Sequence, residues 1–183
     1  MEVLFDAATA RECTFKTFDS YSFAPDGSKL LIATETTPIY RHSYTAVHYI
    51  YSLKRNLDGK INNIVEKLSD GGPQQVPVFS PDGNQVAFVR DNNIFLVKLL
   101  YGNSESQVTE DGKQNEVLNG IPDWVTKRSS PSTVRWNSVP TARCWLSSAS
   151  TRKMFPPTLS LFCRTSPTSP FESIRRVYYN YTN

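Results

Sequence analysis

Few side chains in this sequence could perform chemistry, and the candidates lie close together. His42 and His48 are the only histidines, and either could in principle act as a general base. The 183 residues contain no G-x-S-x-G segment, the turn that presents a serine nucleophile. We therefore predict no catalytic triad. We expect His48, which lies in a strand-like run, to serve in hydrogen-bonded packing.

Arg41, beside His42, could bind a ligand because its planar guanidinium suits carbonyl or carboxylate oxygens. A surface arginine taken alone, however, is more often solvated or ion-paired than bound to a substrate. The three cysteines, Cys13, Cys144 and Cys163, show neither a disulfide framework nor a metal-ligand spacing. We predict no metal site and no cofactor, and we expect Cys13 to be a small buried hydrophobic residue.

The elements that must position these residues precede a sharp change in composition near Val125. Residues 1–125 hold 11 Lys and Arg against 16 Asp and Glu, whereas residues 126–183 hold nine basic residues and one acid. All eight glycines precede the change, and the tail is rich in Ser, Thr, Pro and Arg. Such a composition buries too little apolar surface to offset chain entropy. We predict a folded domain over 1–125 and a poorly ordered basic tail over 126–183.

A repeated phrase marks the front part of the chain. Tyr21–Thr34 and Val78–Asp91 each contain an apolar run, the triplet Pro-Asp-Gly and a second apolar run. The aspartates of the two triplets, Asp26 and Asp82, are 56 residues apart. Proline presets φ and glycine accepts positive φ, so each phrase predicts a tight β-hairpin.

Each hairpin is followed by two further segments that complete a repeat of four strands. The third strands are expected at Tyr49–Leu53 and Ile94–Leu99, and the fourth segments precede the turns in Glu66–Gly71 and Gln107–Gly112. Four short antiparallel strands with a period above 50 residues are typical of propeller blades. We predict an all-β fold of about two four-stranded β-propeller blades, an incomplete propeller. The alternative is an ordinary β-sandwich with two similar hairpins.

Two segments resemble the dipeptidyl peptidase IV family. They are Ile39–Ala46, which contains R-H-S-Y-T-A, and Asn119–Val125, which reads N-G-I-P-D-W-V. The resemblance covers residues 3–125 in order. It implies a secreted, periplasmic or cell-surface serine exopeptidase, itself a homodimer, that removes dipeptides with Pro or Ala in second position from peptide substrates. In that family a hydrolase domain carries Ser, Asp and His, and Arg41 matches a propeller arginine that touches a substrate carbonyl.

The sequence departs from the family pattern immediately after Val125. The family continues Y-E-E-E, whose acidic pair holds the substrate's terminal ammonium, but this chain continues Thr126-Lys127-Arg128-Ser129. Cations therefore stand where the family has anions. The resemblance implies that the 183-residue chain is an inactive fragment of such a peptidase, in which the substrate-binding role of Arg41 is vestigial.

A shifted reading frame explains the departure. Codons shifted by one base from Thr126 permit a family-like continuation of 37 residues, and three of its residues are forced by the printed sequence. Trp136-Asn137 can give only Glu, Cys144-Trp145 only Leu and Met154-Phe155 only Val. The hidden text also contains a third copy of the hairpin phrase, with its Asp near position 141. We therefore interpret residues 126–183 as out of frame after the loss of one base.

The remaining expectations concern partners and location. The sequence has no run of about 18 apolar residues and no signal-peptide pattern, so we expect no membrane segment and leave the location of this chain open. The tail's cations are scattered rather than clustered, which argues against a nucleic-acid arm. Two blades cannot close a ring, so we expect the fragment to associate. The alternative function is a stand-alone propeller-like binding module with a basic anion-binding tail.

Overall fold

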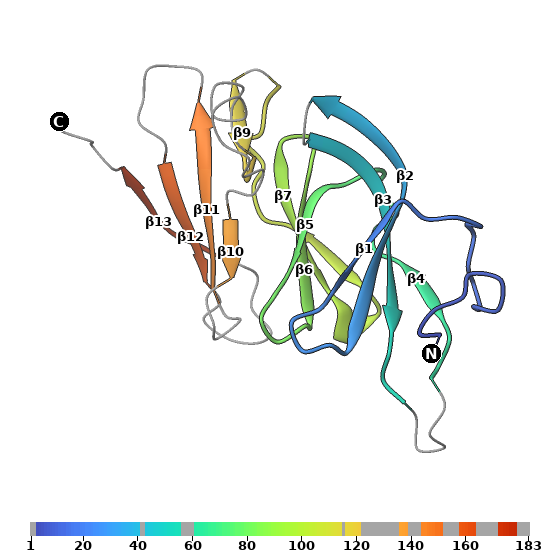
Figure 1. Cartoon of the computed structure of the whole chain (residues 1–183). Helices are drawn as coiled ribbons and strands as arrows, with labels where there is room; N and C mark the ends of the chain where they lie inside the picture. The colour runs from blue at the N-terminus through green and yellow to red at the C-terminus, as the bar shows by residue number, and fades with distance from the viewer. Residues whose placement is uncertain are drawn as a thin grey trace.

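The computed structural model is built from β-strands and describes residues 3–40, 43–55, 61–114, 116–121, 136–138, 144–151, 158–163 and 172–178 (Figure 1). Within these ranges the strands form three antiparallel sheets, and one 3₁₀ turn, η1 (Leu99–Tyr101), follows β7. The predicted all-β class is confirmed.

The first two sheets are the two predicted four-stranded units. The first has the order β1 (Ser20–Phe23), β2 (Lys29–Tyr40), β3 (Ser43–Ser52) and β4 (Val65–Lys67). The second has the order β5 (Gln75–Phe79), β6 (Gln85–Arg90), β7 (Asn93–Lys98) and β8 (Ser104–Gln107). Each sheet follows the chain order, as the strands of a propeller blade do. We call these sheets blade 1 and blade 2.

The Pro-Asp-Gly triplets occupy equivalent turns, between β1 and β2 and between β5 and β6. In each turn the aspartate accepts the backbone N–H two residues on, at 3.0 Å for Asp26 and 3.2 Å for Asp82. The glycines that follow have φ values of +67° at Gly27 and +65° at Gly83. The local chemistry that predicted the two hairpins is therefore present in both.

The core lies between the two blades, whose sheets stack face to face. Its buried residues come from both sheets: Ala24, Leu31, Ile50 and Leu68 from blade 1, and Phe79, Val86, Phe88, Phe95 and Val97 from blade 2. Successive side chains of a strand point to opposite faces, so Ala87 and Val89 of β6 lie on the far face of blade 2. All of Val86–Val89 is buried because both faces of β6 are covered.

The outer face of blade 1 is covered by the chain's N-terminal segment. Phe15 packs on Tyr49 with ring centroids 4.8 Å apart, and Phe5 packs on Tyr51 at 4.9 Å. Cys13 belongs to the same apolar cluster, but it is only half-buried rather than fully buried as expected. Strands β1 to β4 therefore have apolar partners on both sides.

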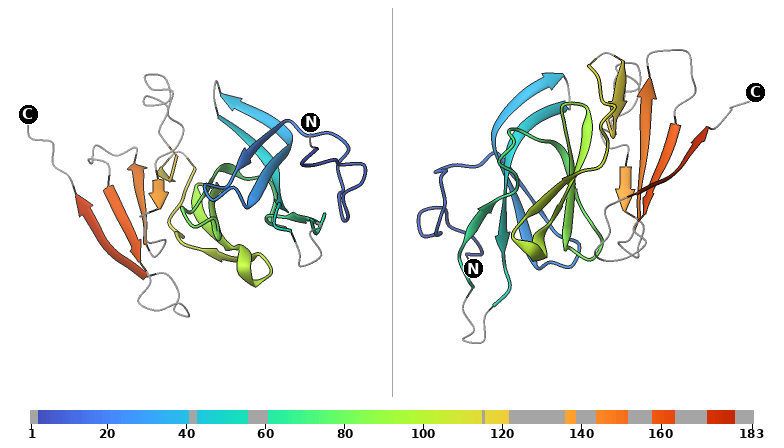
Figure 2. Two further views of the ribbon diagram at one scale, coloured as in Figure 1. Left: turned by 60° about the horizontal axis from the view of Figure 1, so that its bottom comes forward. Right: turned by 180° about the vertical axis from the view of Figure 1, so that it is seen from behind.

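A third sheet follows in the tail, where the sequence predicted poor order. Its strands are β10 (Trp136–Ser138), β11 (Cys144–Thr151), β12 (Thr158–Cys163) and β13 (Glu172–Tyr178), and β9 (Val117–Asn119) pairs with β11 (Figure 2). Backbone hydrogen bonding does not depend on side-chain type, so composition alone did not reveal these strands. The first hairpin of this sheet ends β10 59 residues after the end of β5, close to the predicted third repeat.

The two equivalent turns touch each other across the blade interface. The buried Lys29 donates from Nζ to the carbonyl of Gly83 at 2.8 Å, and burial, aided by Lys54, lowers the pKa of this lysine. The Asp26 carboxylate fills the space beside Gly83, where a Cβ would come within 2.6 Å of its Oδ1. No atom lies within 4 Å of the corresponding position at Gly27.

We therefore expect Gly83→Ala to destabilise the chain more than Gly27→Ala. Both substitutions place an L-residue at positive φ, at a cost of about 1–2 kcal/mol. Only Gly83→Ala also pushes on Asp26 and on the lysine contact, which adds at least about 1 kcal/mol. Denaturant unfolding of the two variants measures the difference. Equal costs would show that the turns do not support each other.

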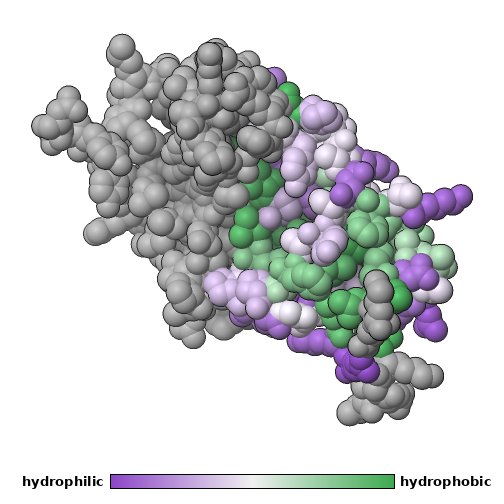
Figure 3. All heavy atoms as spheres, in the orientation of Figure 1, coloured by the Kyte–Doolittle hydropathy of each residue, from purple (hydrophilic) through white to green (hydrophobic). Residues whose placement is uncertain are grey.

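Apolar side chains remain exposed beside the free edge of β1, which among the described strands pairs only with β2. Phe18, Tyr21 and Phe23 are 44%, 60% and 48% exposed, and Figure 3 shows hydrophobic residues gathered over this face. An unpaired edge beside exposed aromatics favours association.

We expect Tyr21→Lys/Phe23→Lys to reduce self-association of the chain, because charges on an edge strand oppose pairing with a second copy. Sedimentation velocity over a concentration series measures the effect. Leu100→Lys is the matched control, since Leu100 is 62% exposed but lies away from β1. If the wild-type chain stays monomeric, or if the control works as well, the edge is not the contact.

Candidate functional site

The long hairpin formed by β2 and β3 extends beyond the rest of blade 1. Strand β1 pairs with β2 only as far as Ala33, and β4 pairs with β3 only from Tyr49 onward. Residues 34–40 and 43–47 therefore form a two-stranded arm (Figure 1). The register along the arm pairs Thr37 with Thr45 and shifts on either side of Thr37 and Pro38. These irregularities bend the arm relative to the blade.

One side of the arm is held by Asp19, just before β1. The backbone N–H of Thr36 donates to Asp19 Oδ2 at 2.9 Å, beside a positive φ of +54° at Glu35. This hydrogen bond holds the pKa of the Asp19 carboxyl below its usual value. The contact is exposed to solvent, so water competes with it.

The other side of the arm is held by a buried pair, His48 and Gln74. His48 is 2% exposed, and its Nδ1 lies 3.0 Å from Gln74 Oε1. Burial lowers the pKa of the imidazole, which favours the neutral form. The prediction that His48 serves in hydrogen-bonded packing is confirmed.

Arg41 and His42 lie outside the described residues, between Tyr40 at the end of β2 and Ser43 at the start of β3. The arm is therefore the element that carries Arg41. The two views of Figures 1 and 2 place the free end of the arm and β9 toward the same end of the stacked sheets. The substrate-binding role of Arg41 stays a prediction.

The second motif, Asn119–Val125, is described as far as Ile121. Asn119 donates from its backbone N–H to the carbonyl of Asn92 at 3.1 Å and from Nδ2 to Asp111 Oδ1 at 3.0 Å. Ile121 is buried against the far face of blade 2. The start of the motif is thus anchored to blade 2. Residues 122–130, which include the family's acidic positions, lie outside the described part of the chain.

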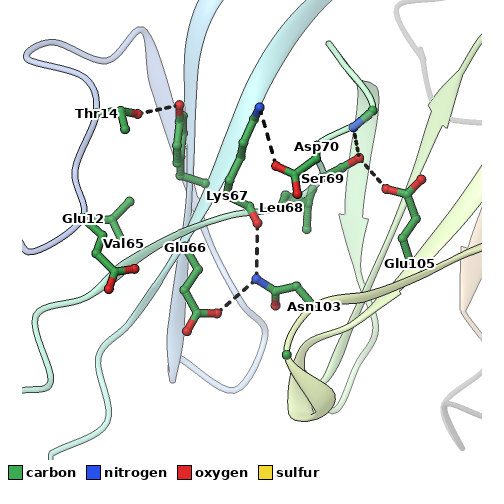
Figure 4. Close-up of a pocket in the computed structure, with 13 residues that line it drawn as sticks. Glu12, Thr14, Val65, Glu66, Lys67, Leu68, Ser69, Asp70, Asn103 and Glu105 are labelled. Atoms are coloured by element: carbon green, nitrogen blue, oxygen red, sulfur yellow. Dashed lines mark hydrogen bonds and ion pairs between the residues drawn. The ribbon is translucent and has the colours of Figure 1, made fainter.

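A groove of about 680 Å³ lies between the outer strands of the two blades (Figure 4). Ser69, Glu105 and Asn103 line it, and Ser69 Oγ bonds to the Glu105 carboxylate. Arg90 donates to Ser69 Oγ at 2.7 Å and to Glu105 at 2.5 Å while its guanidinium lies 4.1 Å from the ring centroid of Phe95. This network fastens the blades to each other.

Sequence reasoning did not find the groove or its network. Ser69 and Glu105 stand 36 residues apart in different repeats, and nothing in the sequence pairs them. Among the residues that the structure describes, no group of three or more His, Cys, Asp or Glu side chains could hold a metal ion.

The comparisons with known proteins fit this geometry. Residues 24–143 match the family model described as dipeptidyl peptidase IV (DPP IV) N-terminal region. The chain belongs to the dipeptidyl peptidase IV family. The match continues 18 residues beyond Val125, to residue 143 in the tail.

Individual relatives of the family agree with this assignment. The chain is 35% identical over 106 residues to human "Prolyl endopeptidase FAP" and 38% identical over 109 residues to a "Probable dipeptidyl peptidase 4" of Aspergillus fumigatus. Each match covers 58% of this chain but 13% of the relative. The chain thus spans a small part of the curated relatives it matches.

A solved structure has the same arrangement. The crystal structure of Porphyromonas gingivalis dipeptidyl peptidase 4 superposes with a TM-score of 0.79 at 32% identity, over 95% of this chain and 28% of that one. The two blades are therefore an N-terminal part of a dipeptidyl peptidase IV propeller. Among the described residues of this family member, no helix is long and apolar enough to span a membrane.

The buried His48 predicts a pH dependence of stability. Its folded-state pKa is lower than the unfolded value of about 6.5, so the unfolded chain binds the proton more readily. The free energy of unfolding should therefore be unaffected by His48 above about pH 6.5 and decrease as the pH falls below it, by at most about 1.4 kcal/mol per pH unit.

Denaturant unfolding at several pH values between 7.5 and 5 measures this effect. His48→Gln, which has no charge to gain, should flatten the dependence. His42→Gln replaces the only other histidine and should leave it as in the wild-type chain. The same slope in all three proteins would contradict the assignment to His48.

Proposed function

We propose that this chain is the N-terminal propeller part of a dipeptidyl peptidase IV-like serine exopeptidase, and that the arm presents Arg41 to a peptide substrate. The longer protein would release X-Pro and X-Ala dipeptides from peptide N-termini. The observation that carries the proposal is the family match over residues 24–143, which includes R-H-S-Y-T-A at the end of the arm.

The arm supports this role because it projects past the blade without apolar cover. Residues 35–39 are exposed, and only the root of the arm is held by the rest of the fold. A guanidinium at such a position can approach a bound peptide and donate to its carbonyl oxygen in a fixed direction. Blade 1 and blade 2 supply the rigid support that a binding residue needs.

The 183-residue chain by itself is proposed to be inactive. A free ammonium taken partly out of water needs carboxylates, but Lys127 and Arg128 stand where the family has acids. The sequence also contains no G-x-S-x-G elbow to supply a nucleophile. Arg41 therefore has neither the acidic partners nor the serine with which it would act.

The loss of one base after Val125 is proposed as the origin of the cationic tail. The hairpin of β10 and β11 supports this interpretation, because it spans residues 136–151 and so includes the position of the hidden third repeat near residue 141. The printed residues of this hairpin lack the Pro-Asp-Gly turn of the first two repeats. A restored frame would supply both the turn phrase and the acidic pair.

The test begins with the encoding DNA. Restoring one base after the Val125 codon should open a long frame that contains a serine elbow, and its product should cleave a Gly-Pro reporter. The unrepaired chain should show no activity that a serine-directed inhibitor blocks. In the repaired enzyme, Arg41→Ala should raise KM by about tenfold or more, as expected when about 1.4 kcal/mol of a charge-assisted hydrogen bond is lost.

Arg41→Lys is the matched variant, because it keeps the charge but loses the planar fork, and its KM should lie between those of the wild type and Arg41→Ala. A closed frame after the repair would contradict the fragment proposal and favour a stand-alone binding module. An unchanged KM in Arg41→Ala would contradict the role of the arginine.

A further inference from the structure

The edge of β3 that faces blade 2 changes partners at the root of the arm. Within blade 1 its partner is β4, and the last contact is from the N–H of Leu68 to the carbonyl of His48 at 2.9 Å. The chain then leaves the edge and returns at Gln74. There Ala46 donates to the carbonyl of Gln74 at 3.0 Å, and Gln74 donates back to the carbonyl of Ala46 at 2.8 Å. Gln74 thus extends the ladder by one pair beyond β4.

The side chain of Gln74 adds a second set of contacts. Its Oε1 accepts the backbone N–H of His48 at 3.0 Å and lies 3.0 Å from His48 Nδ1. An amide oxygen only accepts, so His48 Nδ1 carries the proton in this contact. The amide nitrogen donates to the carbonyl of Gly72 at 2.5 Å, which fixes its orientation.

These contacts are shielded from water. Gln74 is fully buried and His48 is 2% exposed, so each lost hydrogen bond would leave a buried polar group unsatisfied. The contact on the opposite side of the arm, between Thr36 and Asp19, is exposed and therefore weaker. The two sides of the arm are thus held unequally, and the stronger attachment comes from the segment that leads directly into β5.

We propose that Gln74 is a positioning residue that sets the direction of the arm relative to blade 2. Its backbone pairs with Ala46 in β3, and the next residue, Gln75, begins β5, so one residue joins the root of the arm to the first strand of the second blade. That the arm carries a substrate-binding arginine rests on the proposed function. That Gln74 directs the arm does not.

Limited trypsin digestion of the full chain at high dilution tests the proposal. Gln74→Leu keeps the buried volume but removes the three side-chain contacts, and it should accelerate cleavage after Arg41 about tenfold relative to cleavage after the exposed Lys113. Gln107→Leu is the matched control, because Gln107 is an exposed glutamine in β8 that contacts only a neighbouring carbonyl, and it should leave the ratio unchanged.

Two outcomes would overturn the proposal. An unchanged ratio in Gln74→Leu would show that the arm does not depend on this side chain. Equal acceleration at Arg41 and Lys113 would show that Gln74 only supports overall stability, since a positioning role affects the arm selectively.

Hydrogen exchange of the wild-type chain provides a measurement that does not depend on the folding of a variant. The amides of Ala46 and His48 should exchange as slowly as those of Val86–Val89, and faster exchange of both would contradict a firm attachment. The proposed function is tested separately. If Gln74→Leu frees the arm while Arg41→Ala leaves KM unchanged, the positioning role stands and the substrate role fails.

Discussion

The stacking of two four-stranded sheets through an apolar interface is the interaction on which the rest of this structure depends. Phe88 and Val97 of blade 2 are fully buried in this interface, opposite Leu31 and Leu68 of blade 1. Burial of one such large side chain contributes about 1.5–3 kcal/mol, whereas an internal hydrogen bond contributes about 0.5–1.5 kcal/mol net. The apolar contact therefore provides most of the stability, and a single blade would expose one face of its sheet.

Polar contacts across the same interface define how the blades are aligned. Lys29 reaches the turn of blade 2 at Gly83, and Arg90 joins Glu105 to Ser69 at the outer edge. Apolar side chains tolerate sliding, because their contacts are not directional, but these hydrogen bonds have fixed partners and lengths. Together with the Gln74 attachment, they hold the turns, the arm and the outer strands of the two blades in one arrangement.

The arm shows how this arrangement relates to the proposed function. It projects from blade 1, but its root is attached to the segment that starts blade 2, so the stacking of the blades also sets its direction. In a family whose catalytic serine lies in another domain, a substrate-binding arginine must be placed accurately from a distance. A rigid two-blade base with a buried attachment satisfies that requirement better than an isolated hairpin would.

Local chemistry in the sequence was sufficient to predict the hairpins, their turns and the two repeats. Asp26-Gly27 and Asp82-Gly83 form the same turn because an aspartate that accepts the N–H two residues on and a glycine at positive φ specify it without help from distant residues. The family was recognisable for a similar reason, since R-H-S-Y-T-A and N-G-x-x-D-W-V are continuous segments.

Contacts between residues distant in sequence were decided only by the tertiary structure. The pairing of His48 with Gln74 and that of Arg90 with Glu105 join different strands, and no spacing rule predicts them. The strands of the tail were missed because backbone pairing with β9 does not require an alternating apolar pattern. The sequence by itself determined the repeated unit and the family, because both depend on short continuous segments. The stacking of the units decided the direction of the arm and the burial of His48, because both depend on what another sheet places beside them.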